Sequence, residues 1–249
     1  MINSLIIALQ FLTVIPIKVN KVSEKSMANS LAWFPLVGLS LGLLLAVVNF
    51  ILYQLNIPDF MGSVILVVML AGITGAMHLD GLADTFDSIF HPAGKEERLR
   101  IMRDPHIGAM GVVSMASVLM LKVSILAGLS QFIKPMALIL MCVLSRWSAV
   151  LVMFKFPYAR EEGKIKAFTQ NINFKVFSLA TILALFLVLF IWQAQGLLLF
   201  ATVGILSFLF SKFAQKKIGG ITGDILGALL ELNEVLVLLG CLLINNIWR

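Results

Sequence analysis

The sequence contains few charged residues. Asp, Glu, Lys and Arg make up only 13% of its 249 residues, whereas a soluble domain carries about 25%. Hydrophobic residues make up 60%, and the mean hydropathy is +1.00. This composition excludes a soluble globular domain and predicts an integral membrane protein.

Cysteine is also scarce. The two cysteines, Cys142 and Cys241, both fall inside apolar runs. They fit neither a disulfide framework nor a thiolate metal site, so we expect both to be buried hydrophobic residues.

The chain shows no sign of processing or of division into parts. The first seventeen residues have neither a basic region nor a small-residue cleavage site, which argues against a signal peptide and favours an N-terminal interfacial or re-entrant helix. Internal repeats and low-complexity segments are lacking as well. We therefore expect one membrane-embedded catalytic domain over residues 1–249.

Long apolar runs dominate the remaining sequence. Crossing the hydrocarbon core of a bilayer takes about 20 residues, and seven runs approach or exceed this length. Gln195 and Gly196 alone separate the fifth run from the sixth, which predicts a tight helical hairpin. The fold class predicted is an all-α polytopic membrane bundle of about six to seven transmembrane helices plus the N-terminal interfacial helix. The runs are residues 31–53, 60–78, 108–131, 135–154, 174–194, 196–211 and 221–247.

The basic residues are distributed unevenly between the loops. Fifteen of the 19 lysines and arginines fall on one predicted side, in residues 18–25, 95–103, 155–175 and 212–217. By the positive-inside rule this side is cytoplasmic, with the N-terminus and every long loop. We expect a multi-pass protein of the bacterial cytoplasmic (inner) membrane. The net charge of +6 is spread over short loops and not over one soluble face, so we expect no nucleic-acid partner.

An acidic cluster follows the second apolar run, in the stretch His78-Leu-Asp80-Gly-Leu-Ala-Asp84-Thr-Phe-Asp87. If this stretch is helical, the three aspartates lie on one face. Carboxylates that converge repel one another unless a cation lies between them, and Mg²⁺ prefers such oxygen ligands. The alternative is a solvated cluster of loop charges, which would not need helical spacing.

A second motif, Arg103-Asp104-Pro-His-Ile-Gly108, leads into the third span. Arg103 can recognise a phosphate with two hydrogen bonds, and Gly108 allows close backbone approach at a helix start. Ordinary anchoring by arginines at a membrane surface is the alternative. Before this motif, Pro92 predicts the start of a short helix, and Pro105 its end.

Two further motifs lie near the later spans. Tyr158 and Arg160 occupy a short polar loop after the fourth span, where a plain turn is an equal alternative. In Gly219-Gly-Ile-Thr222-Gly223-Asp224, Thr222 is a predicted helix N-cap.

The last span also carries Glu231 and Glu234, which are costly at membrane depth unless they have a function or a partner. We expect Lys122 to pair with such acids. For Arg146 both pairing and substrate contact are open.

Together these motifs resemble the cobalamin (5′-phosphate) synthase family, also called adenosylcobinamide-GDP ribazoletransferase. The resemblance extends from Phe11-Leu-Thr and Phe34-Pro-Leu-Val-Gly38 to the last span. It implies a membrane transferase of late coenzyme B12 biosynthesis. Such an enzyme joins adenosylcobinamide-GDP to α-ribazole or its 5′-phosphate, releases GMP and requires Mg²⁺. The implied partners are these substrates, the lipid bilayer and other B12 assembly enzymes, with a homo-oligomer left open.

The resemblance also implies roles for individual residues. It assigns Asp80, Asp84 and Asp87 to Mg²⁺ and pyrophosphate, and one of them takes the hydroxyl proton. Asp224 completes the metal site or orients the nucleophile. The substrate-binding set is His78, Arg103, Asp104, Gly108, Tyr158, Arg160, Thr222, Gly223 and Glu231, of which Glu231 has pairing with a membrane cation as its alternative.

Two other functions fit part of the pattern. A CDP-alcohol phosphotransferase shares aspartate-rich metal chemistry, but its pattern needs Asp-Gly-x-x-Ala-Arg, and here Asp80-Gly-Leu-Ala is followed by Asp84 with no such arginine. An ion-coupled transporter would use the acids of the last span and predicts inverted repeats, of which the sequence shows none.

Overall fold

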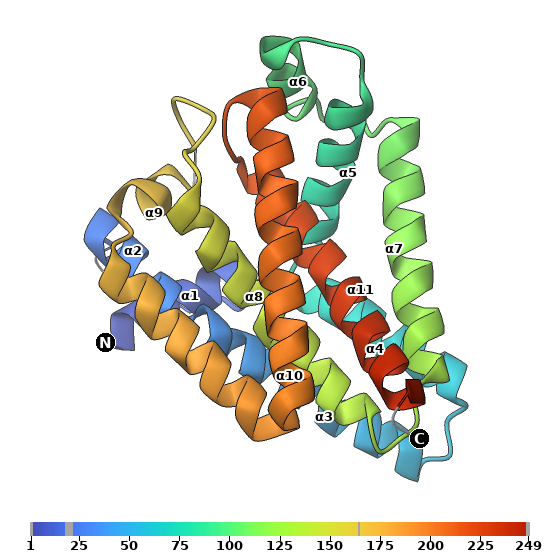
Figure 1. Ribbon diagram of the computed structural model, residues 1–249. Helices are drawn as coiled ribbons and strands as arrows, with labels where there is room; N and C mark the ends of the chain where they lie inside the picture. The colour runs from blue at the N-terminus through green and yellow to red at the C-terminus, as the bar shows by residue number, and fades with distance from the viewer. Residues whose placement is uncertain (1, 18–21, 164, 248–249) are drawn as a thin grey trace.

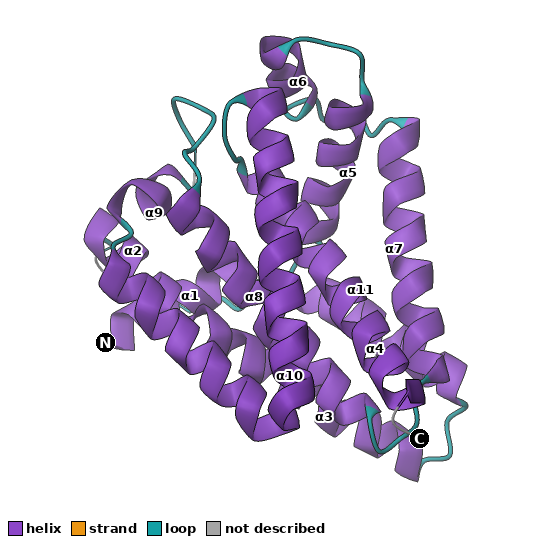
Figure 2. Cartoon of the chain, viewed as in Figure 1, coloured by secondary structure: helices purple, strands orange, loops and turns teal. Residues whose placement is uncertain are grey.

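The computed structural model describes residues 2–17, 22–163 and 165–247. Four basic residues used in the charge count lie outside these ranges, namely Lys18, Lys21, Lys164 and Arg249. The described part of the chain is helical and contains no β-strand (Figure 1, Figure 2).

The helices follow one another with short connections. They are α1 (Ile2–Leu12), α2 (Glu24–Ser30), the 3-10 turn η1 (Leu31–Trp33), α3 (Phe34–Gln54), α4 (Asp59–Ile73), α5 (Met77–Phe90), α6 (Lys95–Ile101), α7 (Ala109–Gly128), α8 (Lys134–Lys155), α9 (Lys166–Asn171), α10 (Phe174–Ile218) and α11 (Gly223–Ile247).

Within the described ranges, five helices are long and apolar enough to cross a membrane, and a sixth span results if α4 and α5 are counted as one bent span. The short apolar helix predicted at the N-terminus is α1. The chain is therefore a multi-pass membrane protein with an all-α fold, as predicted. The two arms of α10 are counted as one helix here, and counting them separately would add one more span.

The 45-residue α10 consists of two arms. Trp192 and Gln193 have non-helical backbone angles, and Figure 1 shows the arms (light and dark orange) meeting in a sharp V at this point. The hairpin predicted between the fifth and sixth spans is thus confirmed, with its bend two residues before Gln195.

Helix α8 forms the centre of the bundle and packs against α3, α10 and α11. Every residue from Leu140 to Val150 is buried, as expected for a helix surrounded by other helices. Gly38 and Gly42 of α3 face its backbone, where a Cβ atom would overlap Cys142 and Ile139. Small residues at this four-residue spacing allow membrane helices to approach closely.

The predicted second span does not continue to residue 78. Helix α4 ends at Ile73, and α5 begins at Met77 after a bend of 88°. Gly75 (φ 63°) and Ala76 (φ 54°) both adopt left-handed backbone angles at the bend, which a regular helix cannot accommodate. Because apolar residues continue across the bend, the sequence pattern did not reveal it.

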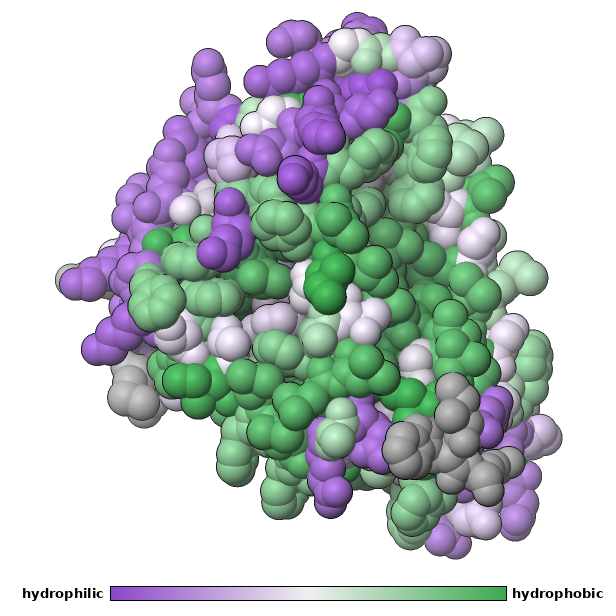
Figure 3. All heavy atoms as spheres, in the orientation of Figure 1, coloured by the Kyte–Doolittle hydropathy of each residue, from purple (hydrophilic) through white to green (hydrophobic). Residues whose placement is uncertain are grey.

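The surface divides into apolar and polar regions. In Figure 3 hydrophobic side chains cover the middle of the molecule, whereas hydrophilic ones gather at the top, over α6, and along the upper left, over α2 and α9. Phe186, Phe190, Leu198 and Ile205 are among the exposed residues of α10. A broad apolar surface of this kind matches a lipid environment.

Candidate functional site

Helix α5 carries the acidic cluster, so the prediction that this stretch is helical is confirmed. Asp80 lies in the first turn and is exposed, and Asp84 and Asp87 are partly buried. At these spacings the three carboxylates project from one side of the helix. Asp84 forms no hydrogen bond within the described residues. Among the acidic side chains, the charges of Asp224 and Asp80 interact most strongly with the carboxylate of Asp84.

Two glycines allow α5 to cross the beginning of α11 closely. A Cβ atom on Gly81 would lie 2.9 Å from the backbone oxygen of Asp224, and one on Gly227 would lie 3.1 Å from the backbone oxygen of His78. Any side chain at either position would push the helices apart. The crossing places Asp224 beside the carboxylates of α5.

A backbone bridge brings the loop after α8 to the same place. The N–H of Ala159 donates to the carbonyl of Ile221, and the N–H of Ile221 donates to the carbonyl of Pro157, both at 2.9 Å. Gly220 is required here because a Cβ atom would overlap the Pro157 carbonyl. Arg160 thereby comes within 2.7 Å of Asp224 and forms an ion pair with it.

Thr222 and Asp224 form the start of α11. The Thr222 hydroxyl accepts the N–H of Ile225 at 3.2 Å, so its predicted role as N-cap is confirmed. The same hydroxyl lies 3.3 Å from Oδ2 of Asp224 and can donate to it. Gly223 is the first residue of the helix and is exposed. The Nε atom of Arg160 is buried and has no hydrogen-bond partner among the described residues, so it can donate to an acceptor from outside the chain.

Asp87 contacts a different helix from Asp80 and Asp84. Its two carboxylate oxygens accept the N–H groups of Gly108 (2.7 Å) and Gly111 (2.8 Å) at the start of α7. The close approach to the Gly108 backbone that the sequence predicted is therefore present. The group that approaches it is the carboxylate of Asp87.

The end of α5 is held by Arg98 of α6, a residue that no motif in the sequence singles out. Arg98 is buried and donates to the carbonyls of Ala93 (2.8 Å), Ser88 (2.9 Å) and Ile89. These contacts satisfy carbonyls that lack partners at a helix C-terminus. In a short polar segment, no sequence pattern distinguishes a buried arginine from its exposed neighbours. Helix α6 itself begins at Lys95 and not at Pro92.

Two adjacent clefts open at this end of the bundle. The first, of about 720 Å³, is lined by Asp87, Asp104 and Gly108 among others, and the second, of about 530 Å³, by Lys95 and Arg160. Arg100 and Arg103 line both clefts. The clefts are therefore connected by two guanidinium groups, which suit recognition of phosphate.

Two predicted residues shape the loops around these clefts. Oδ1 of Asp104 accepts the backbone N–H of His106 at 2.9 Å and lies 2.7 Å from its ring. The backbone N–H is the main cause that lowers the pKa of Asp104. Burial raises the pKa of Tyr158, so its hydroxyl stays protonated and donates to the Glu162 carbonyl at 3.2 Å.

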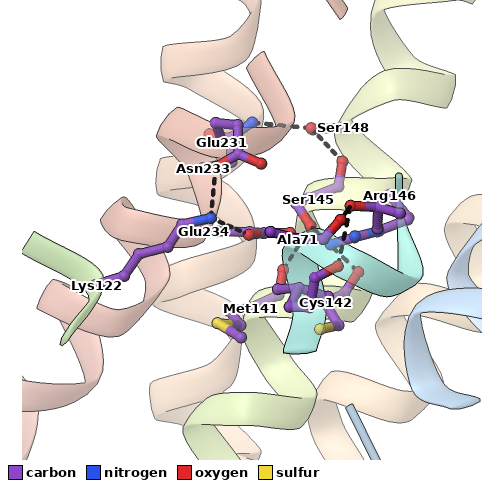
Figure 4. A network of polar contacts seen from close by, with 12 residues as sticks. Ala71, Lys122, Met141, Cys142, Ser145, Arg146, Ser148, Glu231, Asn233 and Glu234 are labelled. Atoms are coloured by element: carbon purple, nitrogen blue, oxygen red, sulfur yellow. Dashed lines mark hydrogen bonds and ion pairs between the residues drawn. The ribbon is translucent and has the colours of Figure 1, made fainter. Parts of the chain in front are cut away.

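Two predicted site residues, His78 and Glu231, lie away from the clefts. Both are buried. His78 lies near the charges of Lys122, Arg146 and Glu234, and Glu231 is part of the same ion network (Figure 4). Glu231 accepts from Lys122 at 2.6 Å. Of the two interpretations of Glu231, pairing with a cation inside the membrane is confirmed, and contact with the substrate stays a prediction.

The network connects three helices and balances its charges. Glu234 of α11 accepts from Lys122 of α7 and from Arg146 of α8, and each of these residues is at most 3% exposed. Asn233 donates to Ser148 at 2.8 Å and to Ser207 at 2.9 Å. The prediction for Lys122 is confirmed, and Arg146 is likewise paired. These contacts assign the network to holding the bundle together.

The acidic residues among those described do not form a complete metal-binding site by themselves. Among the described residues no three His, Cys, Asp or Glu side chains converge closely enough to hold a metal ion on their own. Mg²⁺, however, is commonly held by one or two carboxylates together with substrate phosphates. Asp80 and Asp84 fit this requirement, because Asp80 is exposed, Arg160 lies close enough to Asp84 to act on its charge, and Asp84 forms no hydrogen bond among the described residues.

Comparison with known proteins gives a consistent family. Residues 4–242 match the family model described as cobalamin-5-phosphate synthase. A protein of Desulforamulus reducens named adenosylcobinamide-GDP ribazoletransferase is 35% identical over 244 residues, covering 96% of this chain and 98% of that protein. A protein of Roseiflexus sp. with the same name is 37% identical, covering 93% of this chain and 86% of its own length. No solved structure matches the chain. The chain belongs to the cobalamin-5-phosphate synthase family.

Proposed function

We propose that the protein joins adenosylcobinamide-GDP to α-ribazole or α-ribazole 5′-phosphate and releases GMP. The names of the relatives support this reaction. The observation that carries it is the Arg160–Asp224 pair, which lies beside the carboxylates of α5 and at an arginine-lined cleft. Phosphoryl transfer to an alcohol needs acidic and basic groups together in this way.

The proposed reaction exchanges a phosphoanhydride bond for a phosphate ester bond. A ribose hydroxyl of α-ribazole attacks the phosphorus that carries cobinamide, a new P–O bond forms, and the bond to the bridging oxygen of the pyrophosphate breaks. GMP leaves with that oxygen, and the hydroxyl proton passes to a carboxylate. The protein must align the two substrates and stabilise charge that spreads over the phosphate oxygens.

The arginines take the binding roles. Arg103 and Arg160 hold oxygens of the pyrophosphate, and Arg100 joins them because it lines the same two clefts. The free Nε donor of Arg160 supports this assignment. Asp224 keeps Arg160 in place through their ion pair, and it either orients the hydroxyl of the acceptor or accepts its proton.

Asp80 and Asp84 would hold Mg²⁺ together with the phosphates. The ion, when bound, neutralises charge on the phosphate oxygens. Asp87 is left out of this set, because both of its oxygens already accept backbone N–H groups. One of the two free aspartates of α5 is the alternative proton acceptor.

The active site would face the cytoplasm, in a bacterial inner membrane. The basic segments support this orientation, since α6 and the end of α10 lie at the top of the molecule in Figure 1, and α2 and α9 lie at its left side. The start of α8, with Lys134, lies at the opposite end.

Purified protein in detergent or nanodiscs tests the reaction. With adenosylcobinamide-GDP, Mg²⁺ and each acceptor in turn, we expect GMP and the corresponding adenosylcobalamin or its 5′-phosphate, identified by mass spectrometry. Absence of Mg²⁺-dependent product with both acceptors, from protein shown to be folded, would refute the proposal.

A further inference from the structure

The contacts of Asp87 differ in kind from those of the other two aspartates on its helix. Its carboxylate accepts two hydrogen bonds from the start of α7, at 2.7 and 2.8 Å. Gly108 is the N-cap residue there and has no side chain to serve as a cap. The first N–H groups of a helix have no partner within it, and a negative charge is favourable at this end. Asp87 of α5 therefore caps α7 from outside.

Two glycines at the start of α7, Gly108 and Gly111, leave room for the Asp87 carboxylate. A Cβ atom on Gly108 or Gly111 would overlap the Asp87 carboxylate. The same atom on Gly111 would also come within 3.1 Å of Ala83, one turn earlier on α5. The carboxylate thus fills the space that these two glycines leave open.

The contact fixes one end of a segment that lines the clefts. Residues 102–108 connect α6 to α7 and include Arg103, which lines both clefts. The other end follows α6, which Arg98 joins to the last carbonyls of α5. Helix α5 therefore holds this segment at both ends, through Arg98 and through Asp87.

We propose that Asp87 is a positioning residue. It holds Gly108, and with it the segment that carries Arg103, in the place where the substrate pyrophosphate binds, and it does not ligate the metal. What the segment binds rests on the proposed function, whereas the contact between Asp87 and α7 does not.

Hydrogen–deuterium exchange without substrate tests the contact. In Asp87→Asn the side chain loses its charge and turns an amide NH₂ toward a backbone N–H, so the first amides of α7 should exchange about tenfold faster. Asp80→Asn, the matched change on the same helix, should leave these amides unchanged. Unaltered exchange in Asp87→Asn would overturn the capping role.

Kinetics separate positioning from metal binding. Asp87→Asn should raise KM for adenosylcobinamide-GDP about tenfold and leave the Mg²⁺ concentration for half-maximal rate within about twofold. Asp80→Asn should raise that Mg²⁺ concentration. Gly108→Ala, which places a methyl group against the same carboxylate, should reproduce the Asp87→Asn pattern, and the double variant should be no worse than either single one.

Two other results would decide against the inference or against the proposed function. A shift in the Mg²⁺ requirement of Asp87→Asn as large as that of Asp80→Asn would make Asp87 a metal ligand and overturn the inference. If the wild-type protein releases no GMP, the proposed function fails, but the exchange experiment still decides whether Asp87 caps α7.

Discussion

Glu234→Gln is the change that tests the buried ion network most severely. Glu234 is 1% exposed and accepts from both Lys122 and Arg146. Removal of its charge leaves Arg146 buried without an anionic partner, while Lys122 keeps Glu231. The interior of the bundle then carries an uncompensated positive charge.

The expected loss of stability follows from this burial. Removal of one partner from a buried ion pair costs about 3–5 kcal/mol, because the remaining charge is neither solvated nor paired. For a chain of this length the loss corresponds to a decrease in Tm on the order of 10 °C. Asn233 and its two serine partners are unchanged, so the loss is attributable to the charge.

Thermal unfolding in detergent or nanodiscs measures this loss. Glu97→Gln is the control, since it breaks the Glu97–Arg100 pair, whose side chains are 41% and 80% exposed; no change in Tm is expected there. Lys122→Met should also destabilise, because it leaves two glutamates with one arginine. Adding Glu231→Gln to Lys122→Met restores the charge balance and should recover part of the loss.

Two results would refute this reasoning. A Tm of Glu234→Gln equal to that of the wild type would show that the network does not stabilise the bundle. Strictly additive losses in the Lys122 and Glu231 double variant would show that the two residues do not act as a pair.

Other predictions concern the site and the topology. Gly81→Ala places a methyl group 2.9 Å from the Asp224 backbone and costs about 1–3 kcal/mol of overpacking; GMP release should fall while the protein stays folded, and full activity would contradict the role of the helix crossing. Arg160→Lys keeps the charge but loses the planar donors, so kcat/KM should fall about tenfold or more, and an unchanged value would remove Arg160 from substrate binding. Reporter fusions after residues 90, 165 and 215 should all indicate the cytoplasm, and a periplasmic signal at any of them would contradict the orientation.

Much of the fold could be predicted because long apolar runs and helical spacing extend over many residues of the sequence. Apolar runs marked the long helices, and the pair Gln195-Gly196 marked the hairpin of α10 to within a few residues. The bend between α4 and α5 could not be predicted, because the left-handed angles at Gly75 and Ala76 occur inside a continuous apolar run. Such a bend depends on packing against neighbouring helices, and the local sequence does not show which helices these are.

The site was predictable by residue type but not by partner. Helical spacing placed Asp80, Asp84 and Asp87 on one side of α5, yet only the structure separates Asp87, bound to α7, from the other two. The pairing of Arg160 with Asp224 depends on the backbone bridge between Pro157 and Ile221, two residues far apart in the chain. For Glu231, only the structure shows the pairing with Lys122 of a neighbouring helix.

Turnover of Asp84→Asn tests the central claim most directly. The variant keeps the size of the side chain and removes the charge of a carboxylate that lies beside Asp80 and Asp224. Mg²⁺-dependent GMP release from adenosylcobinamide-GDP and α-ribazole 5′-phosphate should be abolished, while membrane insertion and Tm stay close to those of the wild type. Near-normal turnover of the folded variant would contradict the placement of the active site on α5.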